Sequence, residues 1–99
     1  ICNETAQHCL TKAKQDTANL EDHLRNHEAV MDCQMVCTAT ANFMARRSPF
    51  SQPMHQANAE ICARCAEICE NSQDESEIVK RCAEICRKCE EMCRRYAQQ

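Results

Sequence analysis

The chain has 99 residues, a length that suits one small domain with a single core. Its net charge of −3 with interspersed signs argues against a nucleic-acid-binding protein, and no run of 18 apolar residues exists that could span a membrane. Leu, Ile, Val and Phe supply only 13 residues, so 13 Ala, 5 Met and 11 Cys must provide much of the core, while the absence of glycine argues against a β-sandwich.

The sequence predicts an all-α fold, an antiparallel four-helix bundle that forms one cysteine-rich domain over residues 1–99. We expect helices at about 2–25, 28–46, 52–71 and 75–97, joined by short turns. The first turn is placed at residues 26–28 and the third at 71–74. The second contains Pro49, which breaks a helix, and Pro53, which is tolerated in a first helical turn.

Cysteine follows the inward face of each predicted helix. The fourth helix has cysteine at four successive inward positions, and the third helix has it at three. Two cysteines lie in each of the first two helices. A short internal repeat, Cys-Ala-Glu-Ile-Cys, begins at residues 65 and 82. In chain order the cysteines are Cys2, Cys9, Cys33, Cys37, Cys62, Cys65, Cys69, Cys82, Cys86, Cys89 and Cys93.

Four cysteine pairs have the form Cys-x3-Cys, which places both side chains on one helix face. Their β-carbons are about 5–6 Å apart on a helix, too far for a disulfide, which needs about 3.8 Å. Two thiolates at this spacing can turn toward one ion, and two-coordinate binding suits Cu(I), whereas Zn(II) prefers four ligands. Because buried thiolates are unfavourable without cations, the pattern favours many soft ions over one.

Other interpretations of the cysteines remain open. Reduced cysteine can act as a small core hydrophobe. Alternatively, a disulfide-braced scaffold could join the pair Cys65/Cys69 to the pair Cys82/Cys86. That arrangement resembles the twin Cys-x3-Cys chaperones of the mitochondrial intermembrane space, and it leaves seven cysteines without a role. We expect no enzyme, because the cysteines are repeated and equivalent and the chain has no Glu-x-x-His motif for a di-iron site.

Neutral copper ligands are predicted at one end of the bundle. His55 lies one heptad before Cys62 and is the best non-cysteine candidate. Thioether and imidazole groups bind Cu(I) without adding charge, which suits a site where ions enter. For the methionines, filling of gaps in the core is the alternative. Counting from the turns brings together Met44, Met54, His55, Met92 and Cys93, with His8, Cys2 and Cys9 approaching on the first helix.

Residues 30–96 resemble the bacterial copper storage proteins, a family of four-helix bundles. The resemblance is carried by Met31-Asp32-Cys33 through Cys37, by residues 45–49 (Ala-Arg-Arg-Ser-Pro), and by the repeated segments within 60–69 and 81–93. It implies several Cu(I) ions per chain along the core, a homotetramer, and copper-delivery or acceptor proteins as partners. Positions such as Asp16, Thr40 and Asn58 stand where further thiols might line the core, so a lower capacity is expected.

The cysteine content also bears on location and role. Reduced thiols persist most easily in the cytosol, so we expect a cytoplasmic protein of copper homeostasis that stores or sequesters the metal. The chain begins at Ile1 rather than at Met, which is also compatible with the removal of an export signal.

Overall fold

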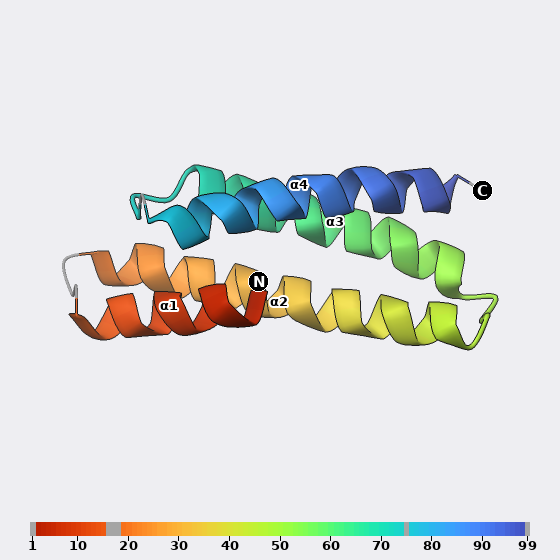
Figure 1. Cartoon of the computed structure of the whole chain (residues 1–99), viewed down its shortest axis with the longest axis horizontal. Coiled ribbons are helices and arrows are strands. Elements are labelled where there is room, and N and C mark those ends of the chain that lie inside the picture. Colours follow the sequence, from red (N-terminus) through yellow and green to blue (C-terminus); the bar gives the residue numbers. More distant parts are fainter. Residues whose placement is uncertain (1, 16–18, 75, 99) are drawn as a thin grey trace.

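The computed structural model describes residues 2–15, 19–74 and 76–98, without the side chains of Cys2 and Asn3. The described helices pack lengthwise into an elongated bundle of 46 × 19 × 18 Å (Figure 1). The predicted all-α helical bundle is therefore confirmed. None of the described helices is long and apolar enough to cross a membrane. The helices are α1 (Cys2–Gln15), α2 (Leu20–Ala45), α3 (Ser51–Glu70) and α4 (Glu77–Ala97).

The first turn lies earlier in the chain than the sequence predicts. Helix α1 ends at Gln15 and α2 begins at Leu20, so the helices expected at 2–25 and 28–46 have wrong bounds. The turn expected at residues 26–28 is also wrong, because these residues lie inside α2. Helix α3 begins and ends one residue before the expected 52–71. Helix α4 ends at the expected Ala97, while the expected first residue of that helix, Glu75, lies outside the described residues.

Buried polar contacts explain why α2 continues through this segment. Asn26 is fully buried, and its side-chain amide donates a hydrogen bond of 2.7 Å to Ser72 Oγ in the α3–α4 turn. His27 Nδ1 lies 2.9 Å from the backbone oxygen of Ala6 on α1. Asn and His are only modestly unfavourable in a helix, and here each has a tertiary partner. Asn26 and His27, which resemble turn residues in the sequence, therefore form contacts between elements.

The predicted proline loop joins α2 to α3. At the end of α2, Arg47 adopts the left-handed conformation with φ 54°, and the amide of Ser48 bonds to the carbonyl of Phe43 at 3.0 Å. Helices often end in this way, usually with glycine at the left-handed position, but this chain has no glycine. Pro53 stands in the first turn of α3, as predicted. The turn brings Met44 of α2 and the first residues of α3 to the same end of the bundle.

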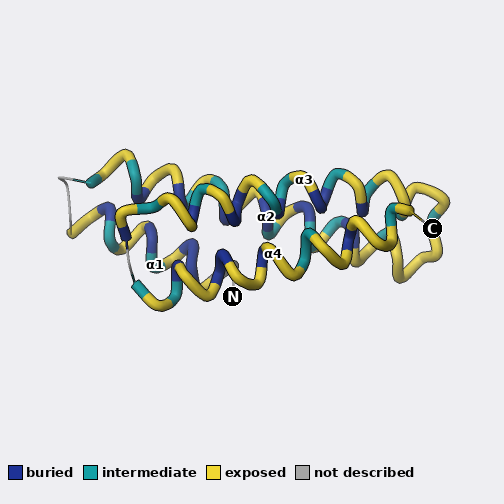
Figure 2. The backbone as a smooth tube through the Cα atoms, turned by 90° about the horizontal axis from the view of Figure 1, so that it is seen from above, coloured by how far each residue is buried: buried dark blue, intermediate teal, exposed yellow. Residues whose placement is uncertain are grey.

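The core consists mainly of small side chains, Ala, Val and Cys. Figure 2 shows the buried positions recurring along each helix. Of the ten cysteines with described side chains, eight are buried, and Cys37 and Cys89 are half-buried. Their predicted inward placement is confirmed, while the side chain of Cys2 and all of Asp16 lie outside the described residues. Helix α1 packs mainly on α2 and more lightly on α4, and it covers only the half of the bundle nearest the α3–α4 turn (Figure 1).

Candidate metal centre

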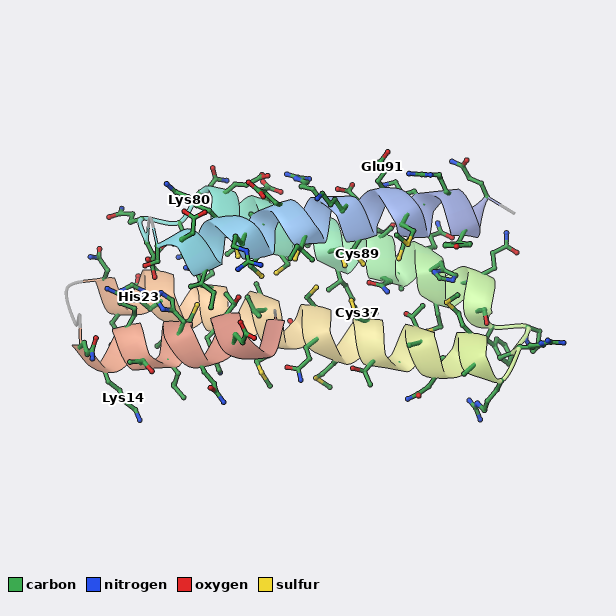
Figure 3. All side chains as sticks on the ribbon, in the orientation of Figure 1. Lys14, His23, Cys37, Lys80, Cys89 and Glu91 are labelled. Atoms are coloured by element: carbon green, nitrogen blue, oxygen red, sulfur yellow. The ribbon has the colours of Figure 1, made fainter. Side chains whose placement is uncertain are left out.

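A row of sulfur atoms runs along the bundle axis. Cys33 on α2 lies in the middle of the row, with its Sγ 3.6 Å from that of Cys62 on α3 and 3.8 Å from that of Cys86 on α4. Cys37, one turn further along α2, lies 4.0 Å from both Cys62 and Cys89. Figure 3 shows Cys37 and Cys89 reaching into the space between their two helices. Sulfur atoms from three helices therefore meet at the centre of the bundle.

Most of these sulfur atoms form three overlapping groups, in each of which all three atoms lie within 4.8 Å of one another. Cys33 and Cys65 each belong to two groups, so the groups form one continuous chain of sites. The row extends to Cys93, 3.9 Å from Cys89, at one end, and to the buried Cys9 of α1 near Cys82 at the other. The groups are Cys33–Cys37–Cys62, Cys33–Cys65–Cys86 and Cys65–Cys69–Cys82.

The spacing suits metal ions that accept two or three thiolates. A metal–sulfur bond of about 2.3 Å places the sulfur atoms of a trigonal site about 4.0 Å apart. The sulfur–sulfur contacts around Cys33 and Cys37 measure 3.6 to 4.0 Å. A tetrahedral zinc site needs a fourth ligand, and each group among the described residues has three members. This ligand set favours an ion with low coordination number and affinity for sulfur, as Cu(I) has.

The cysteines with described side chains are free thiols, and the cross-helix bridges of the alternative scaffold are absent among them. Within the described residues, no Cα atom of α2 lies within 8 Å of a Cα atom of α4. A disulfide requires Cα atoms about 4.4–6.8 Å apart. The contacts Cys33–Cys86 and Cys37–Cys89 therefore cannot become disulfides without backbone movement. Only the tips of these side chains approach each other, which leaves room for an ion between them.

The thiols of the sulfur row differ in how readily they lose their protons. Burial, together with the nearby Asp74 carboxylate, raises the pKa of Cys9 to about 12. Burial likewise raises the pKa of Cys93 to about 12. By contrast, hydrogen bonds from Cys37 and from other neighbouring thiols lower the pKa of the half-buried Cys89. Cys89, next to Cys93, therefore loses its proton more readily than the thiols with raised pKa values, where binding of a metal ion must displace protons.

Asn58 of α3 supplies an oxygen atom that the sequence analysis missed as part of the site. Its Oδ1 accepts hydrogen bonds from the thiols of Cys62 at 3.0 Å and Cys37 at 3.4 Å, and lies 4.0 Å from the Sγ of Cys89. The signal in the sequence is its position four residues before Cys62 on the inward stripe. Thr40 is also buried, but its hydroxyl donates to a carbonyl of its own helix.

Two of the predicted neutral ligands meet at the α2–α3 end of the bundle. Met44 and His55 line one cavity of about 360 Å³, together with Tyr96, whose ring stacks on His55 with centroids 5.0 Å apart. His55 is only 6% exposed, and its Nδ1 has no hydrogen-bond partner within the described part of the chain. Met54 is half-buried and does not line this cavity, and Met92 is exposed. We call the cavity with its lining residues the mouth.

The first helix does not approach the mouth, contrary to expectation. His8 lies near the α3–α4 turn, where its Nε2 is 2.9 Å from Asp74 Oδ2. Cys9 also lies at that end, close enough for the charge of Asp74 to raise the pKa of its thiol. The prediction was wrong because α1 ends at Gln15, so that it pairs with only the first half of α2. The side chain of Cys2 lies outside the described residues.

Comparisons with known proteins agree with this geometry. The crystal structure of the Nmul_A1745 protein from Nitrosospira multiformis has a TM-score of 0.69 and 32% identity, covering 98% of this chain and 88% of that one. The uncharacterized cysteine-rich protein YhjQ of Bacillus subtilis (strain 168) is 31% identical over 70 residues, or 70% of this chain. The chain spans 56% of the length of that relative. A family model described as Csp, copper storage protein, matches residues 1–98, and the chain therefore belongs to the copper storage protein family.

Proposed function

We propose that the protein binds and stores several Cu(I) ions through the thiolates of its core. The observation that carries this proposal is the chain of three overlapping three-sulfur groups, built from free thiols. Isolated buried thiolates are strongly unfavourable, whereas about one monovalent cation per thiolate leaves the core without net charge. One zinc ion would occupy only four of the eleven cysteines. The proposed ligands are all eleven cysteines, together with His55, Met44 and Met54.

Copper is proposed to enter at the mouth. Met44 and His55 offer a thioether and an imidazole, both neutral ligands for Cu(I), at one cavity. Tyr96 stacks on His55 and lies three residues beyond Cys93 on α4, so the cavity adjoins the end of the sulfur row. Met54, in the first turn of α3, is a further thioether near this end. An ion bound at the mouth can then move stepwise to Cys93 and the thiolate-forming cysteine beside it.

We propose a binding role in metal homeostasis rather than catalysis, and a cytoplasmic location. Cysteines are repeated along the row, whereas a catalytic thiol is typically single and paired with a base. Reduced thiols are maintained most easily in the cytosol. A protein that delivers or accepts copper is the corresponding partner.

A homo-oligomer, a tetramer by resemblance to the family, is supported by an apolar groove between α2 and α3. The groove has a volume of about 370 Å³, and Met35 on its rim is 66% exposed. Met31, one turn earlier on α2, is also exposed. Light scattering of Met35→Glu should show a smaller assembly than the unmodified chain, and an unchanged mass would contradict this assignment. The apolar lining includes Ala29, Met35, Val36, Ile61 and Ile68.

The test of copper storage is an anaerobic Cu(I) titration against a competing chromophoric chelator, with free thiols counted before and after loading. We expect tight uptake of several ions, on the order of one per cysteine, with a matching loss of thiol reactivity. Uptake that stops at one or two ions would refute storage and indicate a chaperone or sensor. Negligible uptake together with few free thiols would refute copper binding and favour the disulfide-braced scaffold.

A further inference from the structure

The mouth has further lining residues that the proposed copper ligands do not use. Besides Met44 and His55, the cavity of about 360 Å³ is lined by Arg47 and Ser48 of the α2–α3 turn and by Ser51, the first residue of α3. Arg47 is a permanent cation, and the described lining residues include no carboxylate. Ser51 Oγ and His55 Nδ1 are both buried atoms without a hydrogen-bond partner in the described part of the chain. Buried polar atoms in native proteins normally have partners, so these two point to a ligand.

The chemistry of these further lining residues fits an anion. The planar guanidinium of Arg47 matches a carboxylate geometrically, and the Ser51 hydroxyl is a hydrogen-bond donor. Ser51 is also the first of the 20 residues of α3, where the helix dipole is positive. The independent observation is His55, which is 6% exposed, lines the same cavity and has an unpartnered ring nitrogen. Groups that bind an anion and groups that bind Cu(I) therefore face one space.

On the basis of the copper storage proposed above, we propose that the mouth binds the Cu(I) complex of a small thiol that carries carboxylate groups. Arg47 and Ser51 hold the carboxylate, while the copper ion faces Met44 and His55. A cavity of about 360 Å³ lies in the range of small-molecule sites, which favours a low-molecular-weight carrier over an acidic segment of a protein.

The left-handed backbone conformation of Arg47 would suit glycine better, which indicates that the arginine side chain has a role. Its φ of 54° is a conformation that a residue with a Cβ adopts at a cost in free energy. No ion pair to Arg47 occurs within the described ranges. The neighbouring Arg46 differs, because its guanidinium carbon lies 5.5 Å from the centre of the Phe43 ring and it does not line the cavity. Arg46 therefore provides a matched control.

Transfer from such a carrier is a ligand exchange in which copper remains Cu(I). A bond between copper and the carrier thiolate breaks, and a bond between copper and a protein sulfur, first Cys89 or Cys93, forms. Where the incoming protein thiol is protonated, as at Cys93, its proton passes to the departing carrier thiolate. Charge and protons therefore balance without an oxidant or reductant.

The experiment is stopped-flow measurement of Cu(I) transfer into the full chain from two complexes, one with glutathione and one with 2-mercaptoethanol. Glutathione carries carboxylates, and 2-mercaptoethanol is an uncharged thiol. We compare the unmodified chain with Arg47→Gln, with Arg47→Lys, which keeps the charge, and with Arg46→Gln as the control. Circular dichroism and the final number of bound ions are measured for each variant, so that a folding defect is recognised.

We expect Arg47→Gln to slow transfer from the glutathione complex about tenfold, with no change for the 2-mercaptoethanol complex or in the final copper number. Arg47→Lys should restore much of the rate, and Arg46→Gln should leave both rates unchanged. Equal slowing with both complexes, or no slowing with either, would overturn the carboxylate site while leaving copper storage intact. If the unmodified chain takes up no copper from either complex, the proposed storage itself fails.

Discussion

Cys33 is one of two positions, with Cys65, at which one substitution should disturb two sulfur groups at once. It belongs to two of the three sulfur groups, and its Sγ contacts cysteines on both α3 and α4. Cys93, by contrast, stands at the end of the row and contacts Cys89 at 3.9 Å. If ions are shared along the row, Cys33→Ala must affect two neighbouring sites, whereas Cys93→Ala affects one.

The expected magnitudes follow from these contacts. With a capacity on the order of one ion per cysteine, Cys33→Ala should lower the copper number by about two ions and Cys93→Ala by about one. Loss of one buried sulfur should destabilise the apoprotein by only about 1 kcal/mol, because the remaining side chain is small. Hydrogen bonding with Cys33 also raises the pKa of Cys62 and Cys65, so both thiols should deprotonate at lower pH in Cys33→Ala.

The assay is the anaerobic chelator-competition titration, run on both variants and the unmodified chain at equal concentration. Circular dichroism of the apoproteins confirms that each variant is helical, and ultraviolet titration follows thiolate formation. Equal losses of copper from Cys33→Ala and Cys93→Ala would refute the continuous row and indicate independent sites within single helices.

Three further predictions concern protons and stability. Because the pKa values of Cys9 and Cys93 are about 12, Cu(I) loading at neutral pH should release protons, and the apparent affinity for Cu(I) should rise with pH. A pH indicator in weak buffer measures the proton release. Loading without proton release would contradict the protonated core. Burial opposes ionisation of Asp74, yet hydrogen bonds from Ser76 and His8 hold its pKa below the usual range. Asp74→Asn should therefore cost about 2 kcal/mol at pH 7, and the difference should diminish as the pH falls from about 4 through the lowered folded-state pKa of Asp74. Denaturant unfolding over a series from pH 7 to about pH 2 tests this, and a difference that does not diminish over this range would show that the charge is not responsible. Arg47→Gly should raise the free energy of unfolding by about 1 kcal/mol, since glycine adopts the left-handed conformation freely; a decrease would show that the Arg47 side chain stabilises the turn by packing.

The helical bundle and the inward cysteines could be predicted because the spacing of apolar residues and the presence of helix-breaking residues are both visible in short stretches of sequence. Prolines fixed the α2–α3 turn, and the 3–4 spacing of cysteine on α4 identified its inward face. The turn between α1 and α2 could not be found in this way. Asn26 has the character of a turn residue, and only its tertiary bond to Ser72 shows why it lies within a helix.

The residue types of the candidate site could be predicted from the sequence, but the way in which the cysteines group in space could be predicted only in part. Sequence spacing identifies Cys-x3-Cys pairs, and two of the three sulfur groups contain such a pair joined to a cysteine of another helix. The third group takes one cysteine from each of α2, α3 and α4, a combination that depends on the relative rotation of the helices. The predicted position of His8 depended on the length of α1. Because the first turn was predicted too late in the chain, His8 was expected at the mouth and lies instead near the α3–α4 turn.

Cys9 at one end of the row and Cys89 near the other differ in the direction of their pKa shifts, and this difference gives the row a direction. At the α3–α4 end, the carboxylate of Asp74 adds to burial in keeping the Cys9 thiol protonated. At the other end, hydrogen bonds with neighbouring thiols, first with Cys37, lower the pKa of Cys89. A cation that arrives there meets the thiol of the row that loses its proton most readily. Movement further along the row requires proton loss from buried thiols, so the thiolate beside the mouth is the favourable first ligand.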